Sequence, residues 1–381
     1  MDIKYKGDGE RPYRLVIKIG SSTLTTSDSS IDKEYLDLLA GQVSELMLEN
    51  WECVIVSSGA IACGLGRLGI NERPSSMKTL QAAASVGQSE LAHGYADAFE
   101  KYSRLTSLVL LTRRETADRS AYLHARDTFD ELLELGVVPI VNENDTVSVE
   151  QIRFGDNDSL AALVACLIDA DLVVIASDID GLYDSDPTLS SDASLVRNVG
   201  RITEDILRIA GDAGSSVGSG GMRSKVEAAR VLMAAGIPMA IVNGKEPDAI
   251  VSTAAGRCPG TMFESTERKH AINPRKLWIA LGDSSKGSVT IDDGAVKAVS
   301  TRGASLLSVG IIRVDGSFEA GDIIDIKDSD GLVTARGKSS NSSDEISLSI
   351  GLTRDELAAN RILSHMTESP VVHRDELIVF D

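Results

Sequence analysis

The sequence has few cysteines and none of the spacings that metal ligands require. Cysteines occur only at positions 53, 63, 166 and 258, with no C-x-x-C pair and with apolar neighbours. Such cysteines are typical of reduced thiols in a core and not of disulfides or zinc ligands. The histidines show neither H-x-x-x-H nor H-E-x-x-H spacing. We therefore expect no metal ligated by the protein's own side chains.

A membrane-spanning segment is also missing. No run of about eighteen consecutive apolar residues occurs anywhere in the chain. The N-terminal stretch MDIKYKGDGERPYRLVIKIG has no apolar signal core ahead of its first strand-like run. We therefore expect no membrane association and a cytoplasmic location.

Positive charge is scarce. The chain has 38 Lys plus Arg against 57 Asp plus Glu, a net charge of −19 at pH 7. Broad adhesion to nucleic acid or anionic lipid requires clustered Lys and Arg, so this composition excludes it. A local basic site remains compatible with the same composition.

Apolar runs rich in Val and Ile recur along the first part of the chain. They are short, as buried parallel strands are, and lie at RLVIKIG, ECVIVSSGA, SLVLLT, VVPIVNEND, DLVVIASD and PMAIVNG. Helical patterns separate them, at residues 31–49, 76–102, 118–135, 158–169 and 222–236. This alternation predicts an α/β sandwich with a mainly parallel sheet and with ligands near the carboxyl ends of the strands.

The pattern changes near residue 265 to short strands separated by Gly and Asp turns. The expected strands are KLWIALG, GSVTID, GIIRVDG, DIIDI and EISLSIG. A chain of 381 residues also exceeds what one core usually supports. We expect an α/β domain at 1–265, a polar linker at 266–275, a small β-rich barrel domain at 276–354 and a C-terminal extension at 355–381.

Two of the expected strand ends carry anion-binding features. Lys18 lies within the apolar run VIKIG, where a charge is costly unless an anion meets it, and a Gly-Ser-Ser turn follows. In VSSGAIACG, Ser58 and Gly59 close a strand and open a helix, whose positive N-terminus suits a carboxylate or phosphate. The alternatives are a lysine pointing out of an edge strand and a plain strand-to-helix turn.

Two further stretches have the character of a nucleotide site. In GSGGMRSKVEAAR, Lys225 follows a glycine-rich turn and lies in the first turn of a helix, where a cation needs an anionic partner. This pattern indicates a phosphate loop, with a flexible hinge as the alternative. In LVVIASDIDGLYDSDP, Ser177 and Asp178 end a strand before a loop able to wrap an adenine or ribose.

The segment NENDTVSVEQIRFGDND, residues 142–158, concentrates three Asn and five acidic residues. Alone, such a segment is most simply a solvated loop. Combined with two lysines and two glycine loops, it favours phosphoryl transfer, in which positioning and charge neutralisation do most of the catalysis. Its amides and Asp145 could then bind the ammonium group of a small acceptor.

Taken together, these motifs resemble the amino acid kinase family over nearly the whole chain. The resemblance is carried, in order, by VIKIGSS, VSSGAIACG, QAAASVGQSEL, LLTRRE, ARDTFDELLELGVVPIVNEND, FGDNDSLAALVA, SDIDGLYDSDP and GSGGMRSKVEAARVLMAAG. It implies a three-layer αβα sandwich and ATP-dependent phosphorylation of the γ-carboxylate of L-glutamate, the first step of proline biosynthesis, with Mg²⁺ on the phosphate oxygens. The C-terminal part, through GSVTIDDGAVKAVSTRGASLLSVGIIRVDGSFEAGDIIDI, resembles a PUA domain.

The resemblance also implies roles for individual residues. The catalytic set is Lys18, Lys225 and Asp158. The glutamate-binding set is Ser58, Gly59, Asn142, Asp145, Asp156 and Asn157. The ATP-binding set is Lys18, Ser177, Asp178, Ser219, Gly220, Gly221, Met222, Arg223, Ser224 and Lys225. Arg223 stands where the family commonly has a small hydroxyl residue.

The resemblance further implies inhibition by proline and a homodimer or homotetramer. PUA modules bind RNA in other proteins, but residues 273–381 have 12 Lys plus Arg against 17 Asp plus Glu, which favours a structural or regulatory role. The rival interpretations are a family relative acting on another carboxylate, such as aspartate or acetylglutamate, and an RNA-binding protein with a vestigial kinase fold. The presence of Lys18, Asp158 and Lys225 argues against the second rival.

Overall fold

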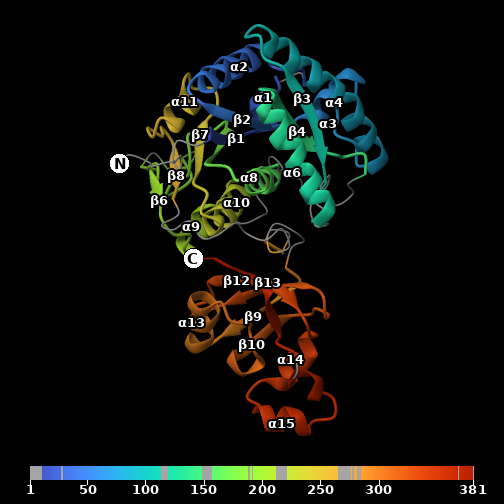
Figure 1. The fold of residues 1–381 in the computed structure, drawn as a ribbon, viewed down its shortest axis with the longest axis vertical. Coiled ribbons are helices and arrows are strands. Elements are labelled where there is room, and N and C mark those ends of the chain that lie inside the picture. The colour runs from blue at the N-terminus through green and yellow to red at the C-terminus, as the bar shows by residue number, and fades with distance from the viewer. Residues whose placement is uncertain are drawn as a thin grey trace. The chain divides into compact units, whose positions relative to one another are not determined.

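The structure is a computed structural model. It describes residues 11–26, 29–112, 119–147, 157–187, 189–190, 192–211, 221–264, 276, 279–280, 285–367 and 369–380. The chain divides into two compact units, Met1–Ala271 and Ile272–Asp381 (Figure 1). The linker predicted at 266–275 lies outside the described residues.

Within the described residues of the first unit, the strands form one mainly parallel sheet. Across the sheet they are β3 (Thr106–Leu111), β4 (Val138–Glu143), β2 (Trp51–Val56), β1 (Tyr13–Ile19), β5 (Leu172–Ser177), β7 (Met239–Asn243), β8 (Thr261–Phe263) and β6 (Asn198–Val199). All the predicted strands of this unit are present, and β8 runs antiparallel to β7. The predicted fold class is therefore confirmed.

Helices cover both faces of this sheet and make three layers (Figure 1). One face carries α2 (Lys33–Leu48), α3 (Ala60–Arg67), α4 (Met77–Glu100) and α11 (Ala249–Ala254). The other carries α6 (Arg119–Glu134), α8 (Asp158–Leu167) and α10 (Met222–Ala235). Short helices α1 (Ser21–Leu24) and α9 (Glu204–Ile209) lie in the connections. The five predicted helices agree with these bounds to within two residues.

The alternation of side chains along β1 explains the direction of Lys18. Leu15, Ile17 and Ile19 are fully buried in the core that includes α2 and α4. Successive side chains of a strand point to opposite faces, so Lys18 points to the other face, which α8 covers. Lys18 is therefore a charged side chain of β1 that lies on the face covered by α8.

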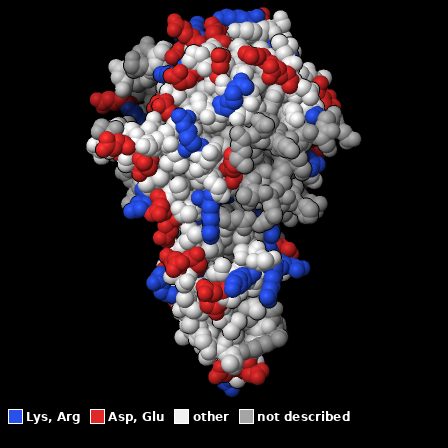
Figure 2. Space-filling view, turned by 90° about the vertical axis from the view of Figure 1, so that its left-hand side faces the viewer, with Lys and Arg blue, Asp and Glu red and all other residues white. Residues whose placement is uncertain are grey.

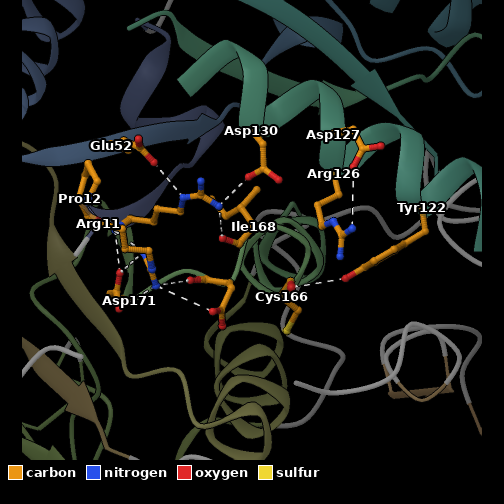
Figure 3. A network of polar contacts seen from close by, with 12 residues as sticks. Arg11, Pro12, Glu52, Tyr122, Arg126, Asp127, Asp130, Cys166, Ile168 and Asp171 are labelled. Atoms are coloured by element: carbon orange, nitrogen blue, oxygen red, sulfur yellow. Dashed lines mark hydrogen bonds and ion pairs between the residues drawn. The ribbon is translucent and has the colours of Figure 1, made fainter. Parts of the chain in front are cut away.

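An arginine network fastens the N-terminal ends of the strands (Figure 3). Arg14 of β1 forms ion pairs of 2.8 Å with Glu52 of β2 and with Asp130 of α6. Arg11 forms an ion pair of 3.0 Å with Asp171, which precedes β5. Ligands of open α/β sheets bind at the opposite, carboxyl ends of the strands. We therefore assign this network to stability.

The second unit contains a five-stranded sheet among its described residues. Its strands, in order, are β10 (Ile311–Gly316), β9 (Gly287–Ile291), β11 (Ile323–Lys327), β12 (Val333–Ser339) and β13 (Val372–Val379). Helical elements accompany it: α13 (Asp293–Arg302), η1 (Ser308–Gly310), α14 (Ser343–Ser349), α15 (Arg354–Ala359) and η2 (Ser364–Thr367). Residues 355–381, expected as an extension, include β13, which pairs antiparallel with β12 at one edge of the sheet.

One expected strand of this unit is a helix. The alternation in EISLSIG predicts a strand, and that prediction is wrong, because α14 occupies this stretch. Ser342 and Glu345 form a capping box: Glu345 N–H donates to Ser342 Oγ at 3.3 Å, and Ser342 N–H donates to the Glu345 carboxylate at 2.9 Å. This helix start outweighs the alternation. The described residues of KLWIALG, at 276, 279 and 280, are helical as well.

Candidate active site

A buried carboxylate joins two buried lysines near the middle of the first unit. Asp158 is the first residue of α8; its Oδ1 lies 2.5 Å from Lys18 Nζ of β1, and its Oδ2 lies 3.3 Å from Lys225 Nζ of α10. The exposed fractions of Lys18, Asp158 and Lys225 are 3%, 0% and 4%. The structure therefore brings together the three residues expected to be catalytic.

The charges of this cluster keep Asp158 ionised. Burial alone would raise its pKa, but the positive charges of Lys18 and Lys225, with hydrogen bonds from Lys18 and Ser224, outweigh burial and lower the pKa. Two positive charges thus face one negative charge. An anion that entered the cluster would meet both ammonium groups.

The start of α10 adds donors beside this cluster. Gly221 is the N-cap residue, with extended backbone, and Met222 opens the first turn. Ser224 Oγ lies 2.9 Å from Asp158 Oδ2 and 2.8 Å from the Gly221 carbonyl. The first N–H groups of a helix lack partners within it and can bind phosphate. Of the expected ATP loop, Ser219 and Gly220 lie outside the described residues.

Arg223, the departure from the family pattern, contacts protein groups beside its own helix. Its Nε lies 3.3 Å from Glu227 Oε1, one turn further along α10. One of its terminal nitrogens donates to the Leu207 carbonyl of α9 at 3.4 Å. These contacts engage the guanidinium within the protein, so a role in binding phosphate is not needed to explain its position.

Amide side chains from strand β4 and from the start of helix α8 meet next to the lysine cluster. Asn157, which immediately precedes Asp158, donates through Nδ2 to Asn142 Oδ1 at 2.8 Å and to the Ser57 carbonyl. Asn142 lies in β4, is 3% exposed, and donates through Nδ2 to Gln88 Oε1 of α4 at 3.3 Å. Asn142, Asn157 and the Ser57 carbonyl, which are far apart in the sequence, thus form one polar wall beside the expected acceptor site.

The turn after β2 continues this wall. Gly59, the N-cap residue of α3, has φ of 90°, a left-handed conformation that glycine adopts without strain. Ser58 is partly buried, and its carbonyl lies 3.2 Å from Ser57 Oγ. Ser57 Oγ also lies 3.0 Å from the buried hydroxyl of Tyr95 on α4. The expected residues Ser58 and Gly59 therefore stand one and two positions after the carbonyl that Asn157 contacts.

Asp145 lies just beyond β4 and is partly buried. Burial raises its pKa to about 6, although the positive charge of Arg73 acts in the opposite direction. A carboxylate that burial destabilises gains most from a cationic partner. Asp156, the other acid expected near the acceptor, lies outside the described residues.

The expected nucleotide residues lie at the end of β5, beside β7. Ser177 is buried, and its Oγ donates to Asp178 Oδ1 at 3.2 Å. Asp180, which received no role from the sequence, accepts from Asn243 Nδ2 and from the Tyr183 hydroxyl, each at 3.0 Å. The only sequence signal for Asp180 was its position two residues after Asp178, in the same loop.

Sequence reasoning also missed Tyr95 and Gln88. Ser57 and Tyr95 meet through their hydroxyl groups, and Gln88 lies inside the motif QAAASVGQSEL without an assigned role. The two α4 residues occur in a helical pattern that marks apolar positions for the core. That pattern does not show which polar groups become buried.

Comparison with known proteins identifies the family. The model of the amino acid kinase family matches residues 13–243, and that of the PUA domain matches residues 287–358. The chain belongs to the amino acid kinase family. A protein from Geobacter sulfurreducens named glutamate 5-kinase is 43% identical over 366 residues, which cover 96% of this chain and 97% of that protein. One of the same name from Caldanaerobacter subterraneus is 40% identical over 368 residues, which cover 97% and 98%.

The described residues contain neither a membrane-spanning helix nor a metal-binding cluster. None of their helices is long and apolar enough to cross a membrane. No group of three or more His, Cys, Asp or Glu side chains among them is placed to hold a metal ion.

Proposed function

We propose that this protein transfers the γ-phosphoryl group of ATP to the γ-carboxylate of L-glutamate and forms L-glutamyl 5-phosphate and ADP, the first step of proline biosynthesis. The observation that carries the proposal is the buried cluster in which Asp158 holds Lys18 and Lys225 beside the Asn142 and Asn157 amides. Near-complete alignment with proteins named glutamate 5-kinase supports the choice of acceptor.

The cluster suits a transfer in which charge is the main obstacle. An oxygen of the glutamate γ-carboxylate forms a bond to phosphorus, and the bond from phosphorus to the bridging oxygen of ADP breaks. The acceptor is already ionised at neutral pH, so no general base is required. Lys18 and Lys225 neutralise the phosphoryl oxygens, while Asp158 holds both ammonium groups in place.

ATP fits the donors that surround this cluster. The α10 N-terminus and Lys225 would bind its phosphates, and Ser177 and Asp178 would lie along the nucleoside. Asp158 is occupied by two lysines, and the described residues contain no group of three or more acidic, His or Cys side chains placed for a metal. We propose that Mg²⁺ enters with ATP, held by phosphate oxygens.

The decisive experiment traps the acyl phosphate. The purified chain is incubated with ATP, Mg²⁺ and hydroxylamine, and hydroxamate is measured with L-glutamate, aspartate or acetylglutamate as acceptor. We expect a signal with glutamate alone, and its loss in Lys225→Ala. A signal with another acceptor would show that the acceptor is not glutamate alone. The absence of any signal from a folded protein that binds ATP would refute the proposal.

We also propose that proline competes with glutamate, since both carry an ammonium and a carboxylate group suited to the Asn142 and Asn157 amides. We propose that the enzyme works in the cytoplasm, where ATP is supplied. Homo-oligomerisation is supported by the edge strand β3, where Leu108 is 39% exposed, and by Leu105 just before it, which is 72% exposed. Light scattering of the wild type and of Leu105→Glu tests this last point.

For the second unit we propose a structural or regulatory role. On the face in Figure 2, acidic and basic side chains are interspersed, and neither sign forms a continuous stripe. Binding to a phosphate backbone requires such a stripe or patch of positive charge. A salt-dependent titration with RNA tests the alternative, and tight binding that weakens steeply with salt would support it.

A further inference from the structure

A buried glutamine of helix α4 contacts the amide wall, which is the part of the polar wall formed by Asn142 and Asn157. Gln88 is 8% exposed. Its Nε2 donates to the Glu143 carbonyl at 3.2 Å, and its Oε1 accepts from Asn142 Nδ2 at 3.3 Å. Both of these partners belong to the end of β4. The side chain therefore spans from the helix layer to the strand that carries a predicted substrate residue.

The contacts of Gln88 and Asn142 leave one consistent orientation for each amide. Asn142 Oδ1 accepts from the Glu143 N–H and from Asn157 Nδ2, both at 2.8 Å. A reversed Asn142 would set its NH₂ group against two donors. A reversed Gln88 would set its oxygen against the Glu143 carbonyl. Gln88 therefore satisfies the Nδ2 side of Asn142, while the Glu143 N–H and Asn157 satisfy its Oδ1 side, and all three contacts hold Asn142 in one orientation.

This orientation determines what Asn157 can offer to a ligand. Its Nδ2 donates to Asn142 Oδ1 and to the Ser57 carbonyl, which uses both amide hydrogens. The remaining polar atom, Oδ1, is an acceptor, and an acceptor suits an ammonium group. Asn157 directly precedes Asp158, the carboxylate of the lysine cluster.

Close helix packing holds Gln88 in position. A Cβ on Gly87 would lie 1.8 Å from the Ala60 carbonyl oxygen, and a Cβ on Gly64 would lie 1.8 Å from the Ala83 carbonyl oxygen. The backbones of α3 and α4 are therefore in direct contact at these glycines. Such contact leaves little freedom for α4 to slide, so the Gln88 side chain starts from a fixed point.

We propose that Gln88 is a positioning residue for the amino-acid acceptor. It keeps Asn142, and through it Asn157, in the orientation that binds the substrate's ammonium group. The inference rests on the proposed glutamate kinase function. The Gln88 amide contacts Asn142 and the Glu143 carbonyl and not the lysine cluster, so loss of its side chain should weaken glutamate binding and leave ATP binding unchanged.

The test is Gln88→Leu, which removes both contacts at similar volume. In the hydroxamate assay with the full chain, KM for glutamate should rise about tenfold, because two buried groups lose their partner. KM for ATP and kcat should stay within about twofold. An equal rise of both KM values, or an unchanged KM for glutamate, would overturn the proposal.

Gln42→Leu is the matched control. Gln42 is also a buried glutamine, 4% exposed, and its Oε1 accepts from the Ile250 N–H at 3.1 Å, away from the amide wall. Both variants should lower the melting temperature, and only Gln88→Leu should raise KM for glutamate. If Gln42→Leu raised KM for glutamate by the same factor, general destabilisation would explain the effect and the proposal would be overturned. A wild type without glutamate-dependent hydroxamate would refute the proposed function instead.

Discussion

Neutralising Asp145 should stabilise the protein in the absence of substrate while it weakens glutamate binding. Burial raises the pKa of Asp145 from 3.8 to about 6, so the folded state holds this carboxylate at a cost above that pH. Asp145→Asn removes the charge with little change in shape. It also removes the anionic partner that we assign to the substrate's ammonium group.

The size and the pH range of the effect follow from linkage. A shift of about two units corresponds to about 3 kcal/mol, and the partial exposure of the side chain reduces the expected effect to about 1–2 kcal/mol. Because the folded state binds the proton more tightly, the stability of the wild type falls as pH rises from about 4 to about 6. The advantage of Asp145→Asn should therefore be full at pH 7.5 and small at pH 4.

Urea denaturation at low protein concentration measures this difference at both pH values. Asp97→Asn, which neutralises an exposed aspartate of α4, is the control for a change in net charge. Saturating glutamate at pH 7.5 should reverse the order of stability, because only the wild type gains the ammonium contact. A stability difference that is independent of pH, or one that the control reproduces, would refute the reasoning.

Three further substitutions test the geometry. Asp158→Asn leaves Lys18 and Lys225 buried without their carboxylate, so it should destabilise the fold by about 3–5 kcal/mol and abolish turnover, as denaturation and hydroxamate formation would show. Gly87→Ala forces a methyl group into the α3 backbone and should destabilise by at least about 3 kcal/mol in urea, whereas tolerance would contradict the close packing. Arg223→Ser should leave KM for ATP within about twofold, because the guanidinium contacts Glu227 and α9; a large change would assign it to the nucleotide.

Much of the first unit could be predicted because its signals are local. Its buried parallel strands are short Val- and Ile-rich runs, and the helices between them show apolar residues at helical spacing. Lys18 was conspicuous as a charge within an apolar strand, and Lys225 as a cation in the first turn of a helix. Their meeting at Asp158 depends on chain topology, and only the family resemblance indicated it.

What the sequence did not reveal depends on contacts between distant segments or on competing local signals. Gln88 has the spacing of an ordinary helical polar residue, and its buried amide meets the end of β4, at Asn142 and the Glu143 carbonyl, far away in the sequence. In EISLSIG, the alternation and the Ser342 capping box predict different structures, and the capping box decided the outcome.

The shared carboxylate of Asp158 also affects when the enzyme can become active during synthesis. Lys18 emerges from the ribosome first, Asp158 much later, and Lys225 later still. A nascent chain that has not yet made α10 has an incomplete charge cluster and no helix N-terminus for phosphate. Such a chain should leave cellular ATP untouched until the last of these three segments has docked.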